Sequence, residues 1–169
     1  FGLAWVQSTG MDSQSVFLPD AAATVALGRE LAGRWLALPK AARPVLLLLG
    51  DLGAGKTCLV QGLAHGLGLV EEVTSPTFAL SQHYSAAAAT PLVHLDLYRL
   101  EAPAAADELF AQEEEEALAL GALMAVEWPG RLSFVPEGAW QLELELADPA
   151  NPAAGRWARL NTQAHLRGS

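Results

Sequence analysis

One run of this sequence combines residue types and spacing that could bind phosphate. The run is Gly50-Asp51-Leu52-Gly53-Ala54-Gly55-Lys56-Thr57, and it matches the pattern G-x-x-x-x-G-K-[ST]. In this pattern the glycines let backbone N–H groups surround phosphate oxygens, the lysine reaches the β- and γ-phosphates, and the hydroxyl ligates Mg²⁺. The start of the following helix adds its positive dipole end. The run therefore predicts a phosphate-binding loop for a nucleoside triphosphate with Mg²⁺.

Chemistry at such a loop also needs carboxylates close by. Asp96 follows the apolar stretch 92–95 and is the candidate for holding the Mg²⁺ shell. Glu127 follows the apolar stretch 123–126 and is the candidate for orienting water or acting as a base. Because the carboxyl ends of parallel strands meet at one sheet edge, we expect Glu127 beside Asp96. The simpler interpretations, a strand-end aspartate and a capping or surface glutamate, stay open.

Other residues carry weaker signals. Ser75 and Thr77 lie in the run Thr74-Ser75-Pro76-Thr77, where a hydroxyl can sense the γ-phosphate, although such a run is usually only a turn. Arg99 could neutralise phosphate charge or form a surface salt bridge. Asparagine occurs only at positions 151 and 161, so no guanine-reading segment is present and adenine is favoured by elimination. We interpret Cys58 as a packed residue and not as a nucleophile.

The elements that must position these residues follow from hydrophobic spacing and turn signals. Asp20 is the expected N-cap of a helix that ends before Pro39, and a second helix follows the loop until Gly66 and Gly68. A third helix is expected over 103–120. Strands are expected over 45–49, 77–84, 92–97, 123–126, 141–146 and 157–160, with 77–84 and 92–97 as an antiparallel hairpin. This order predicts an α/β fold with a mixed, mainly parallel central sheet flanked by helices.

Composition excludes several classes of protein. The chain has 169 residues, which suits one domain with a core that needs no disulfide. Ten basic against 19 acidic residues give a net charge of −9, which argues against holding DNA or RNA directly and against docking on an anionic membrane. The apolar run Val45–Leu49 is too short to span a bilayer. The single cysteine excludes an internal disulfide and favours a reducing compartment, so a cytoplasmic location is expected.

Four segments together resemble the TsaE (YjeE) family of small bacterial P-loop ATPases. They are the loop 49–57, Thr74-Ser75-Pro76-Thr77-Phe78, His94-Leu95-Asp96-Leu97-Tyr98-Arg99-Leu100 and Val126-Glu127-Trp128-Pro129. The resemblance implies an ATP- and Mg²⁺-dependent ATPase subunit for threonylcarbamoylation of adenosine 37 in ANN-decoding tRNAs. It also implies TsaB-like and TsaD-like partners, with tRNA met only through their complex.

The resemblance also implies roles for individual residues. Lys56 would contact phosphates, Thr57 and Glu127 would hold Mg²⁺, and Asp96 would sit behind them or act in hydrolysis. Ser75–Thr77 would face the γ-phosphate, Trp128 would lie near the nucleotide, and Gly155-Arg156 with Ala21–Thr24 would lie by the adenine. The candidate catalytic residues are thus Lys56, Asp96 and Glu127, and the candidate metal ligands are Thr57, Asp96 and Glu127. The candidate nucleotide-binding residues are Asp51, Leu52, Gly53, Ala54, Gly55, Lys56, Thr57, Cys58, Ser75, Thr77, Trp128, Gly155 and Arg156.

The sequence also predicts where the folded domain begins and ends, and it departs from the family pattern at two places. Residues 1–14 are expected to be a disordered or vector-derived terminus, 15–162 a P-loop ATPase domain, and 163–169 a loose tail. Cys58 replaces a threonine that is frequent in the family. Phe110-Ala111-Gln112 and the run Glu113–Glu116 stand where relatives tend to have a glycine. This run is usually a solvated helix face, with a docking surface as the alternative.

Two other functions remain open from the sequence. A small-molecule kinase would use the same loop, but it needs a lid with arginines, and Arg99 is the only arginine between the loop and Glu127. A nucleotide-gated binding module with incidental hydrolysis is the other alternative, because no arginine finger is evident.

Overall fold

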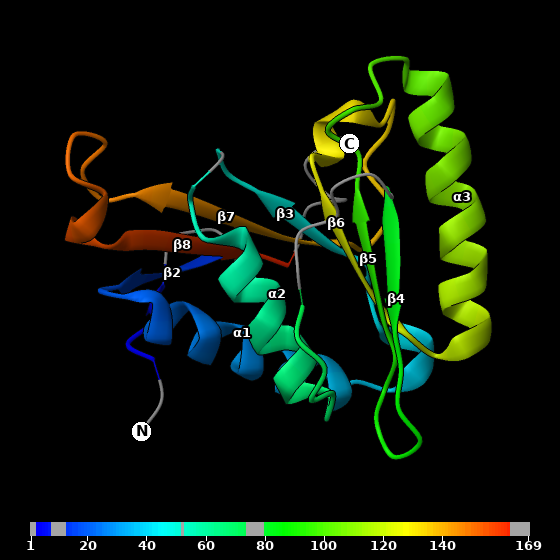
Figure 1. Ribbon diagram of the computed structural model, residues 1–169, viewed down its shortest axis with the longest axis horizontal. Coiled ribbons are helices and arrows are strands. Elements are labelled where there is room, and N and C mark those ends of the chain that lie inside the picture. Colours follow the sequence, from blue (N-terminus) through cyan, green and yellow to red (C-terminus); the bar gives the residue numbers. More distant parts are fainter. Residues whose placement is uncertain (1–2, 8–12, 52, 74–79, 163–169) are drawn as a thin grey trace.

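The computed structural model describes residues 3–7, 13–51, 53–73 and 80–162. A sheet of eight strands, in the order β1-β2-β8-β7-β3-β6-β5-β4, runs through the molecule (Figure 1). The strands are β1 (Val6–Gln7), β2 (Ser13–Leu18), β3 (Leu46–Leu49), β4 (Ser81–Tyr84), β5 (Leu92–Asp96), β6 (Leu123–Glu127), β7 (Trp140–Leu146) and β8 (Arg156–Asn161). The helices are α1 (Ala21–Leu36), α2 (Lys56–Gly66) and α3 (Pro103–Leu120).

The sheet is mixed, as expected, but it is mainly parallel only at its centre. The four central strands β7, β3, β6 and β5 run parallel to one another. The pairs β4–β5, β7–β8, β2–β8 and β1–β2 are antiparallel. The expectation of a mainly parallel sheet is therefore corrected. Antiparallel pairs of consecutive strands, together with the long-range pair β2–β8, flank a parallel centre. All carboxyl ends of the parallel strands meet at one edge.

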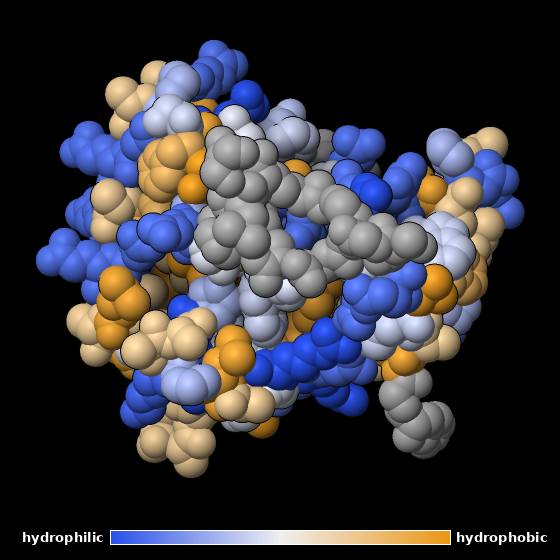
Figure 2. Space-filling model, turned by 180° about the vertical axis from the view of Figure 1, so that it is seen from behind, coloured by the Kyte–Doolittle hydropathy of each residue, from blue (hydrophilic) through white to orange (hydrophobic). Residues whose placement is uncertain are grey.

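Helices cover the two faces of the sheet unequally. Helices α1 and α2 pack on one face, and α3 covers the other face over β4, β5 and β6 (Figure 1). Successive side chains of β3 point to opposite faces of the sheet and so contribute to both cores. Leu46 and Leu48 belong to the core under α1 and α2, while Leu47 belongs to the core under α3. On the face seen in Figure 2, hydrophilic side chains are interspersed with small hydrophobic patches.

Glycines allow α1 and α2 to touch backbone to backbone. A Cβ on Gly62 of α2 would lie 2.1 Å from the carbonyl oxygen of Val25, and a Cβ on Gly28 of α1 would lie 2.3 Å from that of Leu59. Only a residue without a side chain fits such a contact. These close contacts hold α1 and α2 together as one layer.

Most local expectations are confirmed. The Asp20 side chain accepts a hydrogen bond from the backbone N–H of Ala23 at 2.9 Å, as an N-cap does. Strands β4 and β5 form the expected antiparallel pair, and α3 has the expected bounds. No helix of the described residues is long and apolar enough to cross a membrane.

Strands β1 and β2 were not expected from the sequence. Strand β2 pairs with β8 and buries Val16 and Leu18, so the expected boundary at residue 15 lies inside a strand of the sheet. Alternation was the available signal, because Val16 and Leu18 flank the half-exposed Phe17. The first half of β2 consists of serine and glutamine, so the hydrophobic alternation covers only its second half.

Candidate functional site

The segment 50–57, which links β3 to α2 and includes the first two residues of α2, is named the glycine loop. It begins where β3 ends, and Lys56 is the first residue of α2. Gly50 (φ 143°) and Gly55 (φ 103°) adopt left-handed or related conformations, and a Cβ on Gly50 would lie 2.6 Å from the carbonyl oxygen of Leu144. The strand–loop–helix context expected for a phosphate-binding loop is therefore present.

Lys56 lies buried at the centre of the site. Its Nζ donates a hydrogen bond to the carbonyl oxygen of Gly50 at 2.7 Å. The same Nζ is 3.6 Å from Oε1 of Glu127 and 4.8 Å from the ring centroid of Trp128. The ammonium group therefore lies against the loop backbone, a carboxylate and an aromatic face.

The two expected carboxylates meet at the edge of the sheet. Asp96 is the last residue of β5 and Glu127 the last of β6, and they are direct register partners. Burial raises the pKa of Glu127, but the hydrogen bond to His94 and the charges of His94 and Lys56 outweigh it, so its pKa is lowered overall. Glu127 is therefore held as a carboxylate although it is only 7% exposed.

Asp96 has the opposite tendency. Burial is the main cause of the raised pKa of its carboxyl group, and the charge of Glu127 adds to it. A hydrogen bond from the backbone N–H of Tyr98 to Oδ1, at 3.0 Å, offsets only part of this. Two adjacent carboxylates with pKa values shifted in opposite directions are an arrangement typical of acid–base or metal sites.

His94 was not singled out from the sequence. It is fully buried on β5, and its Nε2 lies 2.5 Å from Oε2 of Glu127. The available signal was its position two residues before Asp96, because strand alternation puts both side chains on one face of the sheet.

Trp128 lies beside the glycine loop in an unusual conformation. With φ 58° and ψ 49°, it is the only residue other than glycine with positive φ among the described residues. Its ring packs against that of Tyr98 with centroids 4.8 Å apart, and the Lys56 ammonium lies over its face. A left-handed conformation is costly for a tryptophan, so these contacts hold it in place.

Arg156, at the start of β8, ties the glycine loop to a distant part of the chain. Its guanidinium donates hydrogen bonds to the carbonyl oxygens of Ala54 and Gly53, each at 3.0 Å, and to that of Pro152 at 2.7 Å. A cavity of about 270 Å³ adjoins it. Its lining includes Asp20, Ala21, Thr24, Gly55, Cys58 and Arg156.

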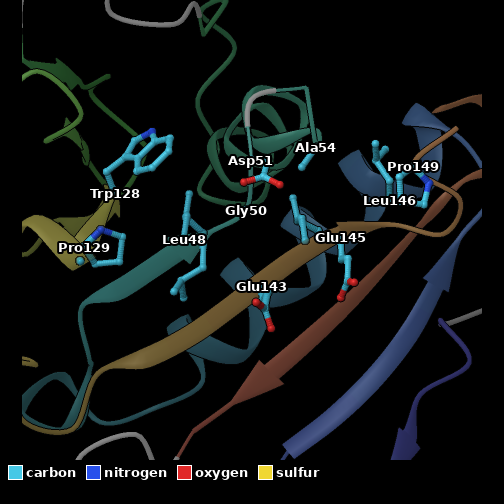
Figure 3. Close-up of a pocket in the computed structure, with 13 residues that line it drawn as sticks. Leu48, Gly50, Asp51, Ala54, Trp128, Pro129, Glu143, Glu145, Leu146 and Pro149 are labelled. Atoms are coloured by element: carbon cyan, nitrogen blue, oxygen red, sulfur yellow. The ribbon is translucent and has the colours of Figure 1, made fainter. Parts of the chain in front are cut away.

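A larger cavity, of about 530 Å³, opens on the other side of the glycine loop (Figure 3). It extends from Trp128 and Pro129 past Asp51 to Glu143 and Glu145 of β7. The glycine loop thus lies between two hollows. Only the smaller hollow is bordered by the start of α1, Cys58 and Arg156 together.

The structure brings most of the predicted site residues together, and three of them lie in segments that it does not describe. Leu52, Ser75 and Thr77 lie outside the described residues. Arg99 is exposed on the turn after β5, so its assignment as a surface residue fits better than one as a phosphate ligand. Gly155 supports Arg156 by turning the chain at φ 98°.

A second group of metal-capable side chains lies away from this edge. His83 of β4 has Nε2 3.2 Å from Glu113 and Nδ1 3.8 Å from Glu116, both on α3. The two contacts are polar pairs that join β4 to α3. They fasten α3 to the edge strand, and they show that Glu113 is buried instead of solvated as expected.

Comparison with known proteins decides the family. The model of the family "Threonylcarbamoyl adenosine biosynthesis protein TsaE" matches residues 18–153. The chain belongs to the TsaE family. It is 45% identical to the TsaE protein of Synechocystis sp. over 128 residues, which cover 74% of this chain and 76% of that protein. It is 30% identical to TsaE of Haemophilus influenzae, covering 83% and 87% of the two chains.

The fold agrees with a solved structure. The crystal structure of YdiB from Bacillus subtilis superposes with a TM-score of 0.60 over 95% of this chain and 93% of that chain, at 23% sequence identity. The two proteins named above are both called tRNA threonylcarbamoyladenosine biosynthesis protein TsaE. Membership of the family places this chain among tRNA modification proteins.

Proposed function

We propose that this chain is an ATP-binding and ATP-hydrolysing subunit for threonylcarbamoylation of adenosine 37 in ANN-decoding tRNAs. The observation that carries the proposal is the convergence of Lys56, Asp96 and Glu127 at the glycine loop. A lysine that can bind phosphate, next to two carboxylates, suits phosphoryl transfer to water. Family membership supplies the pathway.

The residues fit a nucleotide with Mg²⁺. Backbone N–H groups of the glycine loop and the start of α2 suit phosphate oxygens, and Lys56 would exchange its contact with Gly50 for them. The Thr57 hydroxyl with the carboxylates of Glu127 and Asp96 forms an all-oxygen donor set, which Mg²⁺ prefers. When bound, Mg²⁺ would neutralise charge on the phosphates. The raised pKa of Asp96 suits it to accept or hold a proton near the attacking water.

The smaller cavity is the proposed adenine site. It lies at the start of α1, within reach of the glycine loop, and Gly55, Cys58 and Arg156 line it. Of the remaining expected adenine contacts, Ala21, Thr24 and Arg156 line this cavity, and Gly155 directly precedes Arg156. The P-loop NTPase fold and a single domain over residues 15–162 belong to the same proposal.

The proposed partners are TsaB-like and TsaD-like proteins. A net charge of −9 disfavours direct binding of tRNA by this chain. We therefore expect it to act on tRNA only through the partner complex. The names of the relatives support the pathway, and we place the protein in the cytoplasm, where tRNA is modified.

The two lysines of the chain allow a sharp test. Lys56→Ala should abolish detectable ATP–Mg²⁺ binding by calorimetry, while Lys40→Ala, at an exposed site, should bind as the wild type does. Phosphate release should follow the same order. Unchanged binding by Lys56→Ala would contradict the proposal, and ready transfer of phosphate to a metabolite would favour the kinase alternative.

A further inference from the structure

His94 contacts the site from inside the protein and has no part in the function proposed above. It is 0% exposed, and its Nε2 lies 2.5 Å from Oε2 of Glu127. Among the described residues, its Nδ1 has no hydrogen-bond partner. Burying a polar ring is costly unless its atoms are bonded, so the contact with Glu127 is the polar interaction that this buried ring makes.

The sheet register explains how the two side chains meet. His94 is opposite Ala125 on β6, and Glu127 lies two residues further along that strand. Strand alternation puts His94 and Glu127 on the same face, in a diagonal relation that long side chains can bridge.

The two oxygens of Glu127 consequently have different neighbours. Oε2 is held by His94, and Oε1 lies 3.6 Å from Nζ of Lys56, toward the glycine loop. We infer that His94 is a positioning residue, which holds one carboxylate oxygen of Glu127 so that the other is presented to the nucleotide and Mg²⁺. This inference rests on the proposed function, because it assigns His94 a task at that same site.

Two substitutions separate this role from simple packing. In His94→Gln the amide nitrogen can take nearly the place of Nε2, whereas in His94→Asn it is near the place of Nδ1 and falls short of Glu127. We expect His94→Asn to lower kcat for ATP hydrolysis by about 10- to 100-fold, with a much smaller change in KM for ATP. His94→Gln should recover most of the lost kcat.

A double-mutant cycle tests whether His94 acts through Glu127. The affinity of Mg²⁺ for the protein–ATP complex is measured by calorimetry in wild-type and Glu127→Gln backgrounds. His94→Asn should weaken Mg²⁺ binding in the wild-type background and have little further effect beside Glu127→Gln. An equal effect in both backgrounds, or equal behaviour of the Asn and Gln variants, would overturn the inference.

A measurement on the ligand-free protein covers the case in which the His94 variants fail to fold. In protein labelled with ¹⁵N-histidine, the Nε2 signal of His94 should shift clearly between wild type and Glu127→Gln at one fixed pH. An unchanged signal would overturn the inference. Failure of the proposed function would be seen separately, as absence of ATP–Mg²⁺ binding by the wild-type protein.

Discussion

At the scale of single residues, the site is a set of charges that restrain one another. Lys56 and Glu127 are both nearly buried and lie within 3.6 Å, so each offsets the cost of burying the other. Lys56 and the two carboxylates were predictable from sequence, because a motif and two strand ends identify them. His94 and the contacts of Arg156 were not, because they depend on side chains from elements that are distant in the chain.

The two carboxylates should change protein stability with pH in opposite ways. The pKa of Glu127 is lowered in the folded protein, so its stabilising effect is complete above its ordinary value of 4.5 and is lost as pH falls through the folded value. The pKa of Asp96 is raised above 3.8, so its charge destabilises the fold at neutral pH.

Thermal unfolding of two variants measures this contrast. At pH 7, Glu127→Gln should melt below the wild type and Asp96→Asn should melt above it, and both differences should shrink as pH falls below about 4. If Asp96→Asn melts below wild type at pH 7, burial does not dominate the energetics of Asp96.

At the scale of elements, position depends on close packing of helices and on strand register. Helices α1, α2 and α3 were predictable, because hydrophobic spacing, an N-cap and helix-stopping glycines define them locally. Strand β2 was not, because half of its residues are polar and its pairing partner β8 lies about 140 residues later in the chain. The direct approach of α1 to α2 is also a long-range feature, visible only once Gly28 and Gly62 face each other.

Two alanine substitutions compare a packed glycine with a free one. Gly62→Ala should lower the free energy of unfolding by about 1–3 kcal/mol, because the added Cβ would meet the carbonyl oxygen of Val25 at 2.1 Å. Gly33→Ala, in α1 with open space around it, should raise it by about 0.5–1 kcal/mol. Chemical denaturation checks both, and a neutral Gly62→Ala would show that the helices separate at little cost.

At the scale of the whole molecule, a residue of the last strand, β8, contacts the glycine loop that follows β3. The side chain of Arg156 in β8 bonds loop carbonyls more than 100 positions earlier in the chain. This link depends on the sheet order β8-β7-β3, which no local pattern indicates. The acidic balance was predictable from composition, and it fits a subunit that acts through protein partners.

Two arginines of β8 test this link. Arg156→Met removes two hydrogen bonds to the glycine loop and one to Pro152, and it should weaken ATP binding by about tenfold or more. Arg159→Met, which removes an exposed pair with Glu143, should leave ATP binding unchanged. Equal affinities for the two variants, measured by calorimetry, would show that Arg156 does not support the nucleotide site.

The most direct test of the central claim is threonylcarbamoylation in a reconstituted system. Purified TsaB-like and TsaD-like partners, an ANN-decoding tRNA, ATP and a threonylcarbamoyl donor are combined with wild-type, Lys56→Ala or Lys40→Ala protein. The modified adenosine formed per partner complex is then counted by mass spectrometry. The wild type and Lys40→Ala should support repeated turnover and release phosphate, and Lys56→Ala should support neither. Repeated turnover with Lys56→Ala, or with no TsaE protein present, would contradict the account.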